Sequence, residues 1–221
     1  GIAGRYEDYS DFGSQFSGKL SLRYAFTDKV ALRGTAATGF RAPSLAQQHY
    51  QAVTTNINNG VAFETGTFPA SGAAAQALGA EQLKPETSRS YSLGLVLQPL
   101  ERVYLTIDAY QINVDDRIVL SSNLNIANNA AAQALLASLG ITNVTSARYF
   151  NNAIDTRTQG IDVVGTWNVP LAASSLNLTG SYNYNKSKVT RIAPNPAALT
   201  ALGANLERMG RDERGRIEEG A

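Results

Sequence analysis

Several residue types are scarce in this 221-residue sequence, and each scarcity narrows the chemistry available to it. There is no cysteine, which excludes disulfides and thiolate metal sites. The single histidine, His49, has no second histidine or spaced carboxylate near it in the sequence, so we do not expect it to bind a metal. The formal net charge of +1 provides no strong field for nucleic acid.

Long apolar runs and catalytic motifs are also missing. No run of about 18 apolar residues occurs, so the sequence predicts no transmembrane helix. The motifs GxSxG, Walker A, HExxH and GxGxxG do not occur either, and we expect neither an enzyme nor a bound cofactor. The acidic residues Glu7, Asp8 and Asp11 lack EF-hand spacing, so we interpret them as solvated loop charges.

What the sequence does contain is a repeated alternation of apolar and polar residues, the pattern of a strand with unlike faces. In 88–97, for example, Leu93, Leu95 and Leu97 alternate with small, mostly polar residues. The polar positions elsewhere hold Lys, Arg, Asp and Asn, which a dry core would reject, so they meet either bulk water or a wet lumen. Seven segments are predicted strands: 1–10, 17–26, 30–40, 88–97, 102–110, 159–169 and 175–185.

The connections between these segments are unequal in length. Tight turns are expected at 27–28, 98–101 and 170–173, and long loops at 41–86, at about 116–147 and from 187 onward. In an up-and-down antiparallel sheet, this order places the tight turns at one end and the long loops at the other. Transmembrane β-barrels of outer membranes have this asymmetry, so we predict an all-β, antiparallel barrel segment.

Alanine-rich stretches inside the long loops predict short helices. They lie at 73–80, 128–140 and 195–207. We expect Gly140 to end the second, and Asn195 to cap the third with Pro196 in its first turn.

Five segments resemble the TonB-dependent receptors of Gram-negative outer membranes, in the order that this family shows along its barrel. They are YEDYSDFGS (6–14), TGFRAPSLAQ (38–47), LKPETSRSYSLGL (83–95), DAYQINVDDRIVLS (108–121) and TQGIDVVGTW (158–167). The resemblance also identifies Asp115-Asp116-Arg117 as a strand-exit feature.

The resemblance implies a barrel of about 22 strands closed by a plug. It implies import of a scarce nutrient, such as a ferric siderophore, haem, cobalamin or a sugar, with energy from the TonB complex. The expected partners are therefore outer-membrane lipid, the TonB complex through the plug region, and a small nutrient ligand, with no nucleic acid.

Residues 1–221 are then expected to be a partial barrel domain of about seven strands, with the plug and the remaining strands absent. The charged tail 207–221 does not alternate, and we interpret it as the descending side of a long loop.

Arg41 and Glu86 stand at the two ends of the long loop 41–86 and are the candidate site residues. They either pair or face the plug or lumen, where a charge needs a partner. The alternative is that both are solvated loop charges.

Two other functions share the alternation. A passive porin-like channel would lack a plug, and a soluble carbohydrate-binding β-sandwich would bury its apolar faces. The unequal connections disfavour the sandwich, and the five family segments favour the importer over the porin.

Overall fold

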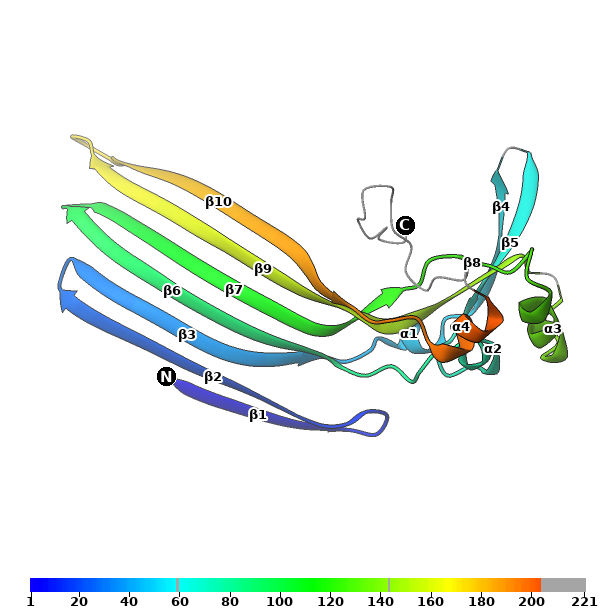
Figure 1. Ribbon diagram of the computed structural model, residues 1–221. Helices are drawn as coiled ribbons and strands as arrows, with labels where there is room; N and C mark the ends of the chain where they lie inside the picture. Colours follow the sequence, from blue (N-terminus) through cyan, green and yellow to red (C-terminus); the bar gives the residue numbers. More distant parts are fainter. Residues whose placement is uncertain (59, 143, 204–221) are drawn as a thin grey trace. The chain divides into compact units, whose positions relative to one another are not determined.

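The computed structural model describes residues 1–58, 60–142 and 144–203 (Figure 1). The predicted descending segment 207–221 therefore lies outside the described residues. The chain divides into two compact units. Unit 1 consists of Gly1–Arg41, Thr87–Asp115 and Asp155–Arg191, and unit 2 of Ala42–Glu86, Asp116–Ile154 and the described residues from 192 onward.

Unit 1 is a sheet of seven long strands that lie side by side (Figure 1). The order β1-β2-β3-β6-β7-β9-β10 follows the chain, as expected of an up-and-down sheet. The seven predicted strands are thus confirmed, although β7, β9 and β10 extend beyond their predicted ends. The strands are β1 Ile2–Tyr9, β2 Gly13–Thr27, β3 Val30–Arg41, β6 Glu86–Leu100, β7 Val103–Leu120, β9 Ser146–Pro170 and β10 Ser175–Ile192.

The strand register confirms the predicted faces. Leu95 lies opposite Ile107, and Leu97 lies opposite Leu105, so the leucine positions of β6 meet the apolar positions of β7. On the other side of the same strands, Gly94 lies opposite Asp108. We call these the apolar face and the polar face of unit 1.

Three tight turns connect neighbouring strands at one end of the sheet, as predicted. They lie at 28–29, 101–102 and 171–174, so Gln98, Pro99 and Leu100 of the second predicted turn belong to β6. At the other end, residues 10–12 connect β1 to β2. A short connection therefore occurs at both ends, and the asymmetry holds only from β2 onward.

The expectation that Asp115-Asp116-Arg117 follows a strand is wrong, because these residues lie inside β7, which continues to Leu120. Asp116 has a φ of 54°, a left-handed conformation that aspartate tolerates better than most residues. Its carbonyl oxygen accepts a hydrogen bond of 2.6 Å from Asn152 Nδ2. The strand thus passes through a local irregularity instead of ending there.

Unit 2 contains short elements around a packed core. The first part of β9 pairs in parallel with β5, where Thr65 lies opposite Ser146, and antiparallel with β8, where Leu124 lies opposite Ala147. The short elements are α1 Leu45–His49, β4 Ala52–Asn58, β5 Val61–Phe68, α2 Ala73–Ala77, β8 Leu124–Asn125, α3 Ala130–Ser138 and α4 Ala197–Leu202. The largest fully buried apolar side chains of the core are Leu78, Leu124, Ile126, Leu136, Tyr149 and Leu199.

Two of the predicted helices are followed by a glycine with a positive φ, a conformation that glycine adopts without strain. After α3, Gly140 has a φ of 80° and donates to Ala137 O at 2.9 Å, while Ile141 N donates to Leu136 O at 3.0 Å. This pair of bonds satisfies carbonyls that would otherwise lack partners at the helix end. After α2, Gly79 repeats the arrangement with a φ of 86°.

Other parts of unit 2 differ from what the sequence predicts. Asn195 does not cap α4; Pro196 occupies the N-cap position and provides no side-chain hydrogen bond there. The hairpin β4–β5 lies inside the predicted long loop 41–86, although the Asn59-Gly60 dipeptide between its strands is a strong hairpin signal in the sequence. None of the helices in the described part of the chain is long and apolar enough to cross a membrane.

Candidate functional site

The polar face of unit 1 carries a charged pair above a glycine. Arg33 on β3 donates from Nε to Asp108 Oδ1 at 2.9 Å and from Nη2 to Asp108 Oδ2 at 2.5 Å. Gly94 lies on β6, the strand between them. A β-carbon at Gly94 would overlap Asp108 Oδ1 and approach Arg33 Nε to 2.9 Å, so glycine leaves the space that this pair occupies.

A second glycine on this face accommodates an aromatic ring. A β-carbon at Gly160 would lie 2.5 Å from the hydroxyl oxygen of Tyr110, so the ring of Tyr110 on β7 lies over β9 at this glycine. Polar pairs also connect β9 to β10: Asp162 with Asn183, Thr166 with Thr179, and Asn168 with Asn177. A face with ion pairs, amides and hydroxyls suits a water-filled lumen and not a dry core.

The apolar face of unit 1 is uncovered in the described residues. Leu22, Leu93 and Tyr182 are 67%, 58% and 63% exposed, respectively. An apolar face built from several strands exceeds the few hundred Å² that soluble monomers usually expose. The face therefore requires an apolar environment.

This apolar band ends within the strands. Further from the tight turns, Gln111 and Asn113 continue the apolar positions of β7, and both make side-chain hydrogen bonds. Gln159 Nε2 donates to Gln111 Oε1 at 2.7 Å, and Arg157 Nε donates to Asn113 Oδ1 at 3.0 Å. A transmembrane strand needs roughly 9–11 residues, which matches the length of β7 from Val103 to the first of these polar positions.

The predicted site residues, Arg41 and Glu86, lie in different units. Arg41 is the last residue of β3, is exposed, and alternates onto the polar face with Arg33. Glu86 is the first residue of β6, and Glu86 Oε1 accepts a 2.8 Å hydrogen bond from the backbone N–H of Ile118. Its 5% exposure shows that Glu86 is not a solvated loop charge.

Sequence reasoning missed a side chain that holds the segment before Glu86. Asn152 Nδ2 donates to Lys84 O, Lys84 N donates to Asn152 Oδ1, and both bonds measure 2.9 Å. A two-way amide clamp of this kind fixes the backbone of the segment. The clamp could not be predicted from the sequence, because Asn152 and Lys84 are far apart in the chain.

The last candidates from the sequence are His49 and the acidic residues near Glu7, considered as metal ligands. Among the residues that the structure describes, no three His, Cys, Asp or Glu side chains gather to hold a metal ion. His49 is the last residue of α1. Glu7 Oε1 instead accepts hydrogen bonds from Arg5 Nη2 and from the hydroxyl of Tyr9, at 2.6 and 3.0 Å.

Three solved structures contain a region similar in fold to this chain. The siderophore receptor PirA from Acinetobacter baumannii matches 86% of the chain with a TM-score of 0.55 and 19% identity. A mutant ferric enterobactin receptor, PfeA, from Pseudomonas aeruginosa matches 80% with a TM-score of 0.52 and 19% identity. The RagAB peptide transporter matches 88% with a TM-score of 0.57 and 13% identity.

The chain spans 25%, 23% and 20% of the length of these three proteins. At such identities the likeness concerns the fold. No curated protein sequence matches the chain.

A family model that matches nearly the whole sequence shows which family the chain belongs to. The family model described as "TonB dependent receptor-like, beta-barrel" matches residues 1–209. This match covers nearly all of the chain, and the up-and-down sheet with one apolar and one polar face is what such a barrel requires. The chain therefore belongs to the TonB-dependent receptor-like β-barrel family.

Proposed function

We propose that this chain is part of an outer-membrane receptor that imports a scarce nutrient with energy from the TonB complex. The observation that carries the proposal is the family match over residues 1–209. In this proposal the apolar face of unit 1 contacts outer-membrane lipid, and the polar face lines the lumen.

A ferric siderophore is the proposed cargo. Two of the matched structures are named as siderophore or ferric enterobactin receptors, which supports this class of ligand. The RagAB peptide transporter has the same fold, so the fold alone is compatible with more than one cargo.

We further propose that residues 1–221 form one segment of a larger barrel whose plug and remaining strands lie elsewhere in the complete receptor. In the described sheet, β1 pairs only with β2, and β10 pairs only with β9. Each unsatisfied backbone group in lipid costs several kcal/mol, so a spanning sheet needs further strands to close it.

Arg41 and Glu86 are proposed to face the lumen or plug. Their support is that Arg41, at the end of β3, has the same parity as Arg33, and Glu86, at the start of β6, has the same parity as Gly94, so both alternate onto the polar face. In this role Arg41→Ala reduces import without removing the receptor from the membrane, which immunoblotting of membrane fractions would verify.

The test is uptake of a radiolabelled ferric siderophore. Cells producing the complete receptor should take up the label, and deletion of the receptor gene or of TonB should each abolish uptake. A passive porin-like channel would continue to admit the label without TonB. Uptake that depends on neither gene would overturn the cargo assignment.

A further inference from the structure

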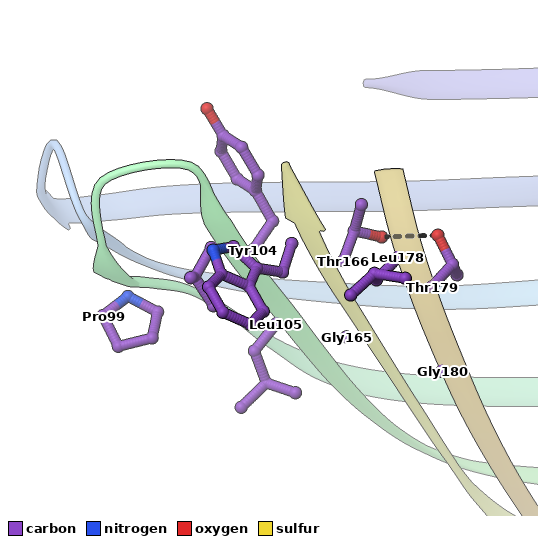
Figure 2. Close-up of a pocket in the computed structure, with 10 residues that line it drawn as sticks. Pro99, Tyr104, Leu105, Gly165, Thr166, Leu178, Thr179 and Gly180 are labelled. Carbon is purple, nitrogen blue, oxygen red and sulfur yellow. Dashed lines mark hydrogen bonds between the residues drawn. The ribbon is translucent and has the colours of Figure 1, made fainter. Parts of the chain in front are cut away.

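The apolar face of unit 1 contains a hollow near the tight turns, with a volume of about 440 Å³ (Figure 2). It lies across β7, β9 and β10, three consecutive strands of the sheet. The lining residues are Pro99, Val103, Tyr104, Leu105, Gly165, Thr166, Trp167, Leu178, Thr179 and Gly180.

Two glycines form the floor of this hollow. The hydrogen bonds between Thr166 and Thr179 and between Asn168 and Asn177 define the register of β9 and β10, which places Gly165 opposite Gly180. A β-carbon at Gly180 would meet nothing within 4 Å, and one at Gly165 would meet only Leu105 Cδ1, at 3.9 Å. The hollow therefore exists because two side chains are missing from a face otherwise covered by large ones.

The walls are apolar. Tyr104 and Leu105 leave β7 in opposite directions, so Leu105 alone points to the apolar face (Figure 2). Trp167 and Leu178 alternate onto the same face as the two glycines and are about half exposed. Thr166 and Thr179 turn their hydroxyls to the polar face, where the two bond to each other at 3.4 Å, and no lining residue is charged. A ligand group that needs hydrogen bonds would lose them here.

We propose that this hollow binds an acyl chain of a membrane lipid. The inference rests on the membrane setting of the proposed function. The hollow is continuous with the band of Leu95, Leu97 and Ile107 that would contact lipid, so its surroundings are hydrocarbon. An unbranched acyl chain lying between Leu105 and the indole of Trp167 would have no polar group of its own to leave unpaired. A lipid held there gains contacts that a smooth leucine face does not provide.

Trp167 makes the site directly observable, because it is the only tryptophan of the chain. The complete receptor is reconstituted in phosphatidylcholine vesicles whose acyl chains are brominated near the middle. The Trp167 signal is the difference between the fluorescence of the parent and of Trp167→Phe. Bromine on a bound chain should quench most of this signal.

The decisive variant is Gly180→Leu, which fills the hollow at a position with open space and ordinary φ. It should lose most of the quenching. Ala109→Leu is the matched control, since it adds the same side chain to an exposed apolar-face position outside the hollow. It should leave the quenching unchanged. Gly165→Ala, a smaller filling of the same floor, should cause a partial loss and serves if Gly180→Leu fails to insert.

The outcomes separate this inference from the proposed function. Equal quenching in Gly180→Leu and Ala109→Leu would overturn the lipid site. Quenching that rises when the receptor is diluted in excess lipid would also overturn it, because a second copy would then have filled the hollow. Intact quenching in a receptor that imports no siderophore would overturn the import proposal alone.

Discussion

The two units of the chain are stabilised in different ways. Unit 2 has a core in which Leu136 is 1% and Tyr149 0% exposed, and the hydroxyl of Tyr149 donates to Leu78 O at 3.0 Å. In unit 1, by contrast, Ala31 is the only buried apolar residue among those described. A single-layer sheet has no second layer to pack against, so its apolar face depends on the solvent around it. The comparison predicts that substitutions that create cavities destabilise unit 2, whereas charges placed on the apolar face destabilise unit 1.

The largest expected effect is a difference in cysteine labelling, which shows which unit is exposed to the extracellular medium. If unit 2 forms the extracellular loops, a cysteine in the exposed Ala131→Cys variant should react on intact cells with a membrane-impermeant maleimide. In Leu100→Cys, at the end of β6 next to a tight turn of unit 1, the cysteine should react only after the outer membrane is permeabilised. The chain has no native cysteine to interfere. Labelling of the turn on intact cells would reverse the assignment.

The next effect tests the core of unit 2. Leu136→Ala leaves a cavity beneath α3 and should cost about 2–5 kcal/mol, as large-to-small core substitutions do. Hydrogen exchange should show faster opening of amides in unit 2, with the central strands of unit 1 unaffected. Leu139→Ala is the matched control, since Leu139 follows the same helix and is 41% exposed. Equal losses in the two variants would mean that the core does not hold unit 2 together.

The contrast also explains what the sequence could predict. The face of each strand residue depends only on its parity along the strand, so Leu93, Leu95 and Leu97 were assigned correctly without knowledge of their partners. In unit 2 the informative contacts join residues far apart in the chain, such as Asn152 with Lys84. Parity says nothing about these pairs. Glu86 is a candidate because of its place at the end of a long loop, but its buried hydrogen bond from Ile118 could not be predicted for the same reason.

Charge on the two faces of β6 gives a third test. Leu95→Arg places a cation on the apolar face and should cost about 2–4 kcal/mol if the position is near the bilayer midplane. Ser92→Arg places the same side chain on the polar face and should cost much less. Folding titrations of the complete receptor into lipid vesicles would measure both. Equal penalties would show that β6 does not separate lipid from lumen.

The smallest expected effect concerns the polar face itself. Gly94→Ala puts a methyl group where Asp108 Oδ1 and Arg33 Nε now lie, so the ion pair must move aside. The pair is partly exposed, with side-chain exposures of 47% for Arg33 and 23% for Asp108, so its loss should cost only about 1 kcal/mol. Gly180→Ala, which meets nothing within 4 Å, should be nearly neutral in the same vesicle titration.

A double-mutant cycle makes this last test specific. Asp108→Ala should destabilise the parent, but it should add little to Gly94→Ala, because the pair is already broken there. Additive costs would show that the methyl group acts on the backbone of β6 and not on the Arg33–Asp108 pair. The pair would then remain formed in Gly94→Ala, and glycine at this position would need another explanation.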